Sequence, residues 1–369
     1  RQLRLAPEDV PGQLLILANS TKGSPRAQAV LDLFLAVEQE TVLGWLAPVL
    51  RQNRIGHLNG ALQVLRALNS PASAALIRET LLSGSFRGPV REALEICQAL
   101  DPAGTRPFLI GCLDRPEPEL RLHAEALLRG RVGEEDLEPL GALTRSPRSD
   151  TRLRALRLVF GVRSPAAAPI FLARLADEAT GCAHLAAQGL GRLEILPPEI
   201  QELVAAGPGR GRGFAFALLA LILKDEAGPA RALDPGLAPM LLEGLRGPDP
   251  LAGSLCAIAL GRISFQSDDL TGLAFQDQEV MDRLIGLLAA RIFFPEYGLL
   301  LPMAERTAAL LSGRTGHLVA REWAQWWQAH REGFAAGRAS LPLDRTEQRQ
   351  RTVVVLADPV ESFVLRSRD

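Results

Sequence analysis

Apolar residues recur at helical spacing along most of this chain. Three segments show the pattern clearly: Leu120, Ala124, Leu127 and Leu128; Leu153, Leu156 and Phe160; and Leu251, Leu255, Ile258 and Ala259. Steps of three, four and seven residues place these side chains on one face of a helix, whereas a half-buried strand alternates every two residues. The pattern therefore predicts amphipathic helices.

Proline pairs mark where these helices are expected to begin. Ser-Pro or Asp-Pro pairs occur at 24–25, 70–71, 101–102, 146–147, 164–165 and 234–235, and Gly-Pro pairs occur at 88–89, 228–229 and 247–248. A Ser or Asp side chain can accept from the first amides of a helix, and proline fits the first helical position. Gly191 and Gly261 follow apolar stretches, so we expect them to form left-handed caps at helix ends.

The helical segments repeat with a period of about thirty residues, which is the length of two short helices and a turn. Similar dipeptides recur late in successive second helices: Ala67-Leu68, Ala99-Leu100, Ala126-Leu127, Gly189-Leu190 and Ala259-Leu260. The predicted helix pairs are 41–68, 72–100, 105–129, 135–161, 165–193, 198–224, 236–263 and 278–311. Such a unit cannot bury its apolar face alone. We therefore predict an all-α, right-handed α-solenoid of stacked pairs.

Four regions follow from this pattern. They are an N-terminal helical cap at 1–40, the repeat solenoid at 41–313, a Trp-rich capping helix at 314–336 and an extended tail at 337–369. Within the tail, residues 352–356 are β-branched and apolar, which predicts a strand, and residues 362–365 form a candidate second strand. An isolated hairpin is marginally stable in water. The tail is therefore expected to fold back on the solenoid or to join the sheet edge of a partner.

One segment resembles a known repeat family. Asp114-Arg115-Pro116-Glu117-Pro118-Glu119-Leu120-Arg121, followed by Ala124-Glu125-Ala126-Leu127, is similar to the second helix of bacterial HEAT repeats of the phycobilisome-lyase-like type. The segment from Pro248 to Arg262 is a looser match. The resemblance covers residues 41–313 and implies scaffolds, adaptors, regulatory subunits and a few lyases. No set of matching catalytic residues accompanies it, so lyase activity is not carried over.

Composition limits the classes of partner. The chain of 369 residues has 41 Lys and Arg against 42 Asp and Glu, a formal net charge of −1. Nucleic-acid binding requires an uncompensated basic surface, so this balance argues against it. The longest apolar run, residues 214–223, is about half the length of a membrane span. The sequence opens on Arg1 rather than Met, which favours a removed export signal and an extracytoplasmic location over the cytoplasm.

Candidate catalytic and metal-binding chemistry is sparse. The sequence contains no G-x-S-x-G, H-E-x-x-H or P-loop motif. Its four cysteines, Cys97, Cys112, Cys182 and Cys256, have no C-x-x-C spacing and lie in apolar stretches. We expect them to be buried thiols, and we predict no metal site, no cofactor and no enzymatic activity.

An arginine-rich block is the strongest surface signal. Between 139 and 174 the sequence opposes Asp150 with seven arginines, of which five form the predicted partner-binding patch: Arg145, Arg148, Arg152, Arg154 and Arg157. Residues 265–282 are acidic by contrast. Solvated helix faces explain both blocks, and the functional alternative is electrostatic complementarity with a partner.

Two further segments are candidate contacts. The glycine-rich loop at 207–213 carries Arg210 and Arg212, which predicts either a plain linker or an anion-binding loop. Trp323, Trp326 and Trp327 lie on one short helix. They are expected either to seal the last repeat or to form an exposed aromatic anchor.

Together these features favour a non-catalytic scaffold or adaptor that binds a protein partner, within a larger complex, through its concave surface, the arginine block and the tail. One alternative is a HEAT-like lyase or a nucleic-acid-base enzyme with an anion-binding groove. That enzyme requires Arg145, Arg152, Arg154, Arg157, Arg210 and Arg212 on one face. The other alternative is a structural subunit of an envelope or motility assembly, whose tail or Trp helix would protrude.

Overall fold

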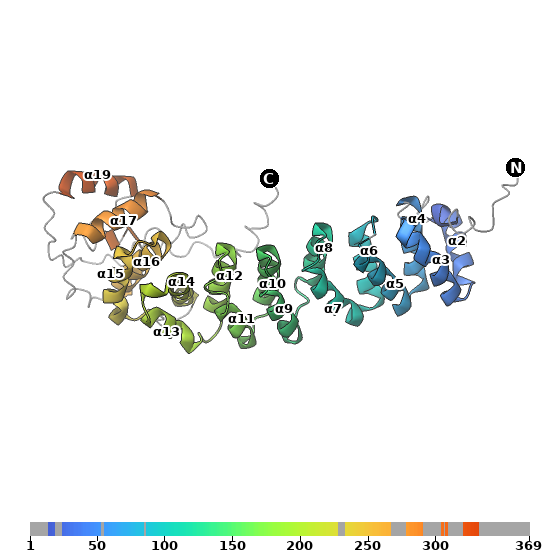
Figure 1. The fold of residues 1–369 in the computed structure, drawn as a ribbon, viewed down its shortest axis with the longest axis horizontal. Coiled ribbons are helices and arrows are strands. Elements are labelled where there is room, and N and C mark those ends of the chain that lie inside the picture. Colours follow the sequence, from blue (N-terminus) through green and yellow to red (C-terminus); the bar gives the residue numbers. More distant parts are fainter. Residues whose placement is uncertain are drawn as a thin grey trace. The chain divides into compact units, whose positions relative to one another are not determined.

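In the computed structural model, helices joined by turns and loops make up the described part of the chain. The structure describes residues 14–18, 24–52, 55–84, 86–227, 233–266, 278–290, 304–305, 307–308 and 320–331. Every regular element in these ranges is an α-helix or a short 3-10 helix (Figure 1). The all-α prediction is thus confirmed for the described residues. The predicted tail at 337–369, with its candidate strands, lies outside them.

The chain divides into two compact units, residues 1–167 and 168–369, a division that falls inside the predicted solenoid at 41–313. The first unit contains α2 (Pro25–Leu35), α3 (Gln39–Gln52), α4 (Ile55–Leu68), α5 (Pro71–Leu82), α6 (Val90–Leu100), α7 (Pro102–Cys112), α8 (Pro118–Leu128), η1 (Glu134–Asp136), α9 (Leu137–Leu143), α10 (Ser149–Gly161) and η2 (Pro165–Ala167). The second contains α11 (Ala168–Leu172), α12 (Thr180–Gly191), α13 (Pro198–Ala205), η3 (Pro208–Arg210), α14 (Arg212–Ala227), η4 (Pro235–Leu237), α15 (Ala238–Arg246), α16 (Pro250–Gln266), α17 (Gln278–Ala290) and α19 (Ala320–His330).

Within each unit the helices pack as pairs on their sequence neighbours. In the first unit α3 packs on α4, α5 on α6, α7 on α8 and α9 on α10. The second helices of adjacent pairs also touch, α4 with α6, α6 with α8, and α8 with α10. In the second unit α12, α14 and α16 form the corresponding series. This repeat-like packing agrees with the predicted stacking of two-helix units.

Three of the predicted caps are present. The side-chain oxygens of Ser24, Ser70 and Asp101 accept from backbone amides three residues later, at 3.2, 3.2 and 2.9 Å, and a proline opens each helix. The prediction fails at Ser146, because α10 begins at Ser149 and the Ser146 hydroxyl instead bonds Asp114 Oδ1 at 3.0 Å. The proline pairs at 164–165 and 234–235 open 3-10 turns.

The two predicted left-handed glycine caps are wrong. Gly261 lies inside α16, and Gly191 is the last residue of α12, followed by Arg192 in the right-handed region at φ −87°. The reason for glycine at 191 is close packing: an added Cβ would lie 2.8 Å from Leu223 Cβ on α14. The left-handed conformation occurs instead at Gly84, Gly130, Gly207 and Gly211.

The core is made of small and branched apolar side chains between the helix layers. On α14 every side chain from Phe214 to Ile222 is buried, which accounts for the longest apolar run in the sequence. The cysteines at 97, 112, 182 and 256 are buried and form no disulfide, as predicted. Burial raises the pKa of the Cys97 and Cys112 thiols to about 12, because the thiolate loses its hydration.

In the described part of the chain, no single helix is long and apolar enough to span a membrane. Helices α2 and α3, which are bent by 116° relative to each other, reach the required length and apolar composition only when they are counted as a pair.

Candidate functional site

Four arginines link a repeat to the one before it by donating to carbonyls of its loops and helix ends. Arg115 and Arg148 lie in loops, whereas Arg212 and Arg283 lie on α14 and α17. Arg115 donates to the carbonyl of Leu82 at 2.9 Å, and Arg148 donates to those of Asp114 and Arg115 at 2.9 and 3.1 Å. In the second unit Arg212 donates to Asp177 O at 3.1 Å, and Arg283 donates to Pro248 O at 2.6 Å. Helix ends and turns leave carbonyls without partners in the helix, so these guanidinium groups satisfy them. We call Arg115, Arg148, Arg212 and Arg283 the loop arginines, after the loops and helix ends whose carbonyls they bind.

Two further arginines each bind the loop of their own repeat. Arg121 on α8 donates to the carbonyls of Arg115 and Pro116, at 2.7 and 2.9 Å. Arg152 on α10 makes the equivalent contacts with Ser146 and Pro147, at 3.0 and 3.2 Å. The same role therefore appears in two successive repeats, and Arg152 serves the fold of its own loop.

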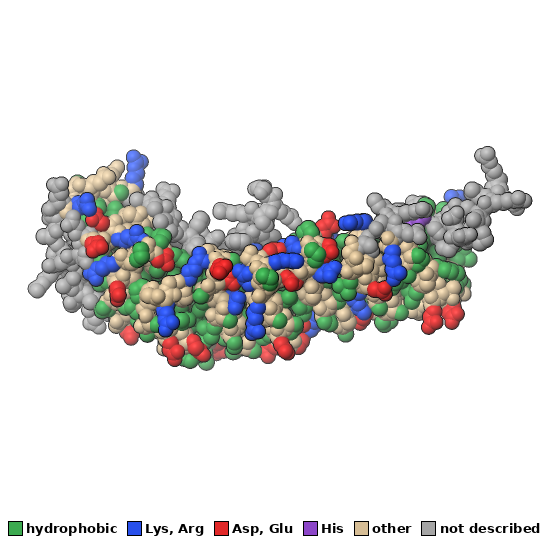
Figure 2. Space-filling model, in the orientation of Figure 1, with side chains coloured by type: hydrophobic (Ala, Val, Ile, Leu, Met, Phe, Trp, Pro, Cys, Tyr) green, Lys and Arg blue, Asp and Glu red, His purple; other side chains and the backbone are tan. Residues whose placement is uncertain are grey.

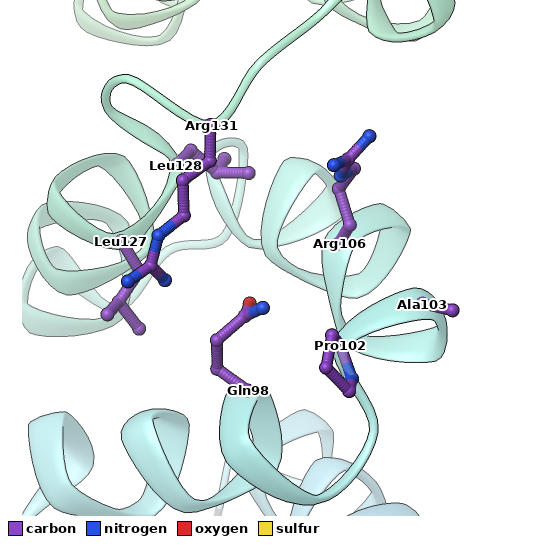
Figure 3. A pocket seen from close by; sticks show the side chains of 7 residues that line it. All are labelled: Gln98, Pro102, Ala103, Arg106, Leu127, Leu128 and Arg131. Carbon is purple, nitrogen blue, oxygen red and sulfur yellow. The ribbon is translucent and has the colours of Figure 1, made fainter.

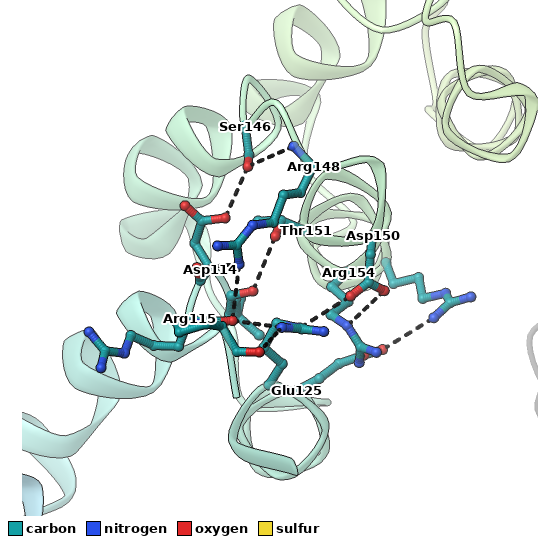
Figure 4. A network of polar contacts seen from close by, with 12 residues as sticks. Asp114, Arg115, Glu125, Ser146, Arg148, Asp150, Thr151 and Arg154 are labelled. Atoms are coloured by element: carbon teal, nitrogen blue, oxygen red, sulfur yellow. Dashed lines mark hydrogen bonds and ion pairs between the residues drawn. The ribbon is translucent and has the colours of Figure 1, made fainter. Parts of the chain in front are cut away.

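A buried carboxylate gathers the remaining arginines between α8 and α10. Glu125 is 3% exposed, and its carboxylate pairs with Arg129 at 3.4 Å, with Arg157 at 3.7 Å and with Arg154. Asp150 pairs with Arg154 at 3.1 Å and with Arg121 at 3.2 Å. Figure 4 shows Glu125 and Arg154 directed toward each other from the two helices. We call the six residues Arg121, Glu125, Arg129, Asp150, Arg154 and Arg157 the Glu125 cluster.

The Glu125 cluster carries more positive than negative charge. Four guanidinium groups face two carboxylates, which leaves a surplus of two positive charges. The Arg129 and Arg157 side chains are 54% and 34% exposed, whereas those of Arg121 and Arg154 are 17% and 16% exposed. Arg129 and Arg157 are therefore the arginines of the cluster that are most accessible to solvent.

The structure gives most of the arginines of the predicted patch partners within the chain. Arg148 and Arg152 bind loop carbonyls, and Arg154 is held mainly by Glu125 and Asp150. Arg145 is exposed, and Arg157 is half-buried in the Glu125 cluster. Glu125 and Arg129 lie outside the predicted patch, because a count of charges along the chain does not show which residues of neighbouring repeats lie together. The repeat period was the signal that could have found Glu125, which lies about one repeat before Arg154.

The predicted anion loop is divided between two roles. Arg212 donates to the carbonyl of Asp177 at 3.1 Å and to Thr180 Oγ1 at 3.2 Å, so its guanidinium group joins α14 to the preceding loop. Arg210 is exposed in η3. The glycines at 207 and 211 have φ of 78° and 57°, which shows that they serve the turn.

The Trp helix, α19, packs on α17. Trp323 and Trp327 are buried, and Trp327 Nε1 donates to Asp282 Oδ1 at 2.7 Å. Arg331 donates to the other oxygen of Asp282 at 2.8 Å, and these two hydrogen bonds, chiefly that of Arg331, hold the pKa of Asp282 below its usual range. Trp326 is half-buried and stacks on the His330 ring at 4.8 Å. Of the two alternatives for this helix, burial of Trp323 and Trp327 favours the capping role over an exposed aromatic anchor.

A groove of about 680 Å³ lies between α6, α7 and α8 (Figure 3). Seven residues line it: Gln98, Pro102, Ala103, Arg106, Leu127, Leu128 and Arg131. Arg106 is already paired with Glu135 and, at 3.6 Å, with Asp136. These carboxylates offset the positive charge of the groove, so the Glu125 cluster is the stronger candidate for binding a charged group.

Metal-ligand residues do not converge in the described part of the chain. There, no group of three or more His, Cys, Asp or Glu side chains has the arrangement needed to hold a metal ion. The candidate site is accordingly the arginine-rich face of α8 and α10.

Comparison with known proteins adds no family assignment. No protein-family model matches the chain, and no curated protein matches it. Solved structures that are similar include an engineered protein from a structural genomics consortium, 15% identical, with 97% of this chain and 93% of that chain covered and a TM-score of 0.31. A likeness at that TM-score carries no argument about fold or function.

Proposed function

We propose that this chain is a non-catalytic scaffold or adaptor, a right-handed solenoid of HEAT-like pairs that binds a protein partner. The observation that carries the proposal is the Glu125 cluster, where stacked second helices present a surplus of two positive charges. Stacked pairs offer extended surfaces on which charge complementarity fixes the register of a partner. The resemblance of residues 114–127 to HEAT repeats supports the same function.

The internal contacts count against the enzymatic alternative. An anion-binding groove built from all of the predicted arginines needs their guanidinium groups on one face. Arg152 and Arg212 instead donate to loop carbonyls of the fold. Burial of Trp323 and Trp327 likewise counts against a protruding Trp helix in a structural subunit.

The proposal is tested by crosslinked affinity purification of the full chain. Arg129→Glu/Arg157→Glu reverses the two most exposed charges of the Glu125 cluster. The matched control is Arg26→Glu/Arg66→Glu, which changes two exposed arginines elsewhere in the first unit. We expect the cluster variant to lose a partner that the wild type and the control recover. Equal recovery by all three proteins contradicts binding through this face.

A further inference from the structure

The groove between α6, α7 and α8 is a second candidate site, because none of the residues of the Glu125 cluster lines it. Its walls are partly apolar, from α8 on one side and from α7 on the other (Figure 3). The apolar lining residues are Leu127, Leu128, Pro102 and Ala103. Its volume of about 680 Å³ is within the range of ligand sites in proteins, roughly 300–1,000 Å³. The groove therefore has room for one residue of a bound chain, including its side chain.

The turn that follows α8 brings Arg131 to the groove. The helix ends at Leu128, and Gly130 has a φ of 74°, a left-handed conformation that glycine adopts without strain. The chain turns back at this glycine, so that the Arg131 amide donates to the carbonyl of Leu128 at 2.9 Å. Figure 3 shows the guanidinium group of Arg131 directed into the groove from this turn.

Two polar side chains point into the groove and have no partner there. Gln98 on α6 is half-buried, and its amide is directed into the groove from the side opposite Arg131 (Figure 3). Neither side chain forms a hydrogen bond or an ion pair with any residue that the structure describes. A guanidinium group offers donors alone, whereas a side-chain amide offers an acceptor as well. A ligand that uses both groups fully therefore carries acceptors for Arg131 and a donor for Gln98.

The carboxylates around the groove have arginine partners of their own. Asp101, which lies between α6 and α7, accepts from Arg78 at 2.7 Å. Glu135 pairs with Arg106, the other arginine that lines the groove. Of the two lining arginines, Arg131 is therefore the one available to a ligand. One guanidinium group binds one carboxylate through two parallel hydrogen bonds, so the groove suits a ligand with a single carboxylate.

We infer that this groove binds the C-terminal residue of a protein partner, and that this residue has an apolar side chain. The terminal carboxylate accepts from Arg131, and the backbone N–H of the same residue donates to the side-chain oxygen of Gln98. The apolar side chain contacts Leu127 and Pro102. A small aliphatic acid has the carboxylate but no N–H donor, so the observations favour a chain terminus. The inference rests on the proposed function in taking the ligand to be a protein, but it concerns a different site.

The inference is tested by the retention of labelled peptide pools on the immobilised full chain. One pool has mixed residues before a terminal leucine with a free carboxylate. A second pool is identical except that the terminal carboxylate is an amide, and a third has serine in place of the terminal leucine. We expect the first pool to be retained about tenfold more than either of the others, because each of these lacks one of the two matched groups.

Variants of the two polar side chains assign the contacts. Arg131→Gln removes the cation, and we expect it to lower retention of the free-carboxylate pool about tenfold and to leave the amidated pool unchanged. Gln98→Met removes the amide at nearly constant size, and we expect it to lower retention of both leucine pools about threefold. Since neither side chain has a partner among the described residues, both variants should keep the urea midpoint of the wild type. The control Arg145→Gln changes an exposed arginine outside the groove and should retain all pools as the wild type does.

Three results would overturn the inference. They are equal retention of the free-carboxylate and amidated pools, retention that Arg131→Gln leaves unchanged, and displacement of the first pool by 4-methylpentanoate as readily as by N-acetyl-leucine. The last result would assign the groove to a small aliphatic acid, because 4-methylpentanoate has the carboxylate and the side chain of leucine without its N–H. Any of these leaves the proposed function standing, since crosslinked purification with Arg129→Glu/Arg157→Glu tests that function at residues outside the groove. Recovery of the crosslinked partner by that variant would instead contradict the proposed function and leave the groove inference standing.

Discussion

Arginine has three different roles in this molecule, and the side chain alone does not reveal which applies. Arg148 reaches loop carbonyls of the preceding repeat, Arg152 reaches its own loop, and Arg129 shares a buried carboxylate. The sequence predicted a basic block, but the role of each member depends on atoms about one repeat away. The partner of each arginine could be found only once the register between repeats was known.

The loop arginines are expected to stabilise the fold. Arg148→Gln removes two hydrogen bonds from a charged donor, and we expect a loss of about 1 kcal/mol, since the residue is solvent-exposed. Arg145→Gln is the matched control three residues earlier. Arg145 is exposed, and no side-chain hydrogen bond or ion pair joins it to the described residues, so we expect a change within about 0.5 kcal/mol. Urea unfolding of both variants checks the difference, and equal effects would refute the assignment.

His184 makes stability depend on pH. Burial lowers its pKa to about 4 from the ordinary 6.5, because the charged imidazolium loses its hydration. The unfolded chain binds a proton more readily than the folded chain, so stability is retained above pH 6.5 and is lost as the pH falls toward 4. The loss is at most about 3 kcal/mol. Thermal melting across this range should show a flatter pH dependence for His184→Gln, and an unchanged slope would contradict the role.

At the scale of the element, periodicity and capping predicted much of the helix order, and close packing accounts for what they missed. Ser70 and Asp101 cap helices as expected, since that chemistry is local. Ser146 does not, because it bonds Asp114 in the preceding repeat. The local sequence likewise predicted a helix cap at Gly191, whereas the glycine is required because α14 packs closely against α12 at this position. Local signals predict an element well only where no neighbouring repeat competes for the same group.

Two glycines distinguish packing from helix propensity. Gly191→Ala places a Cβ 2.8 Å from Leu223 Cβ, so α12 and α14 must separate, and we expect a loss of about 1–3 kcal/mol. Gly111→Ala on α7 meets no atom within 4 Å, and the better helix propensity of alanine should add about 0.5–1 kcal/mol. Melting temperatures of the two variants should move in opposite directions. A melting temperature of Gly191→Ala that does not fall would show that α12 and α14 tolerate the added methyl group.

At the scale of the whole molecule, stacked pairs explain why the core spreads along the chain and why the candidate site lies on a surface. The sequence predicted the pairs because each must bury an apolar face on its neighbours. It did not predict the division between residues 167 and 168, which no break in the apolar pattern marks. Nor did it predict the Glu125 cluster, since that arrangement joins side chains from two successive second helices.

Internal contacts of Arg148 hold neighbouring repeats together, whereas we propose that the face carrying Arg129 and Arg157 contacts a partner. The most direct test measures urea unfolding and recovery of the crosslinked partner for the same two full-length variants. Arg148→Gln should lose stability and still recover the partner, whereas Arg129→Glu/Arg157→Glu should keep most of its stability and lose the partner. Loss of the partner in Arg148→Gln without loss of stability, or full recovery of the partner by the double variant, would contradict this division of roles.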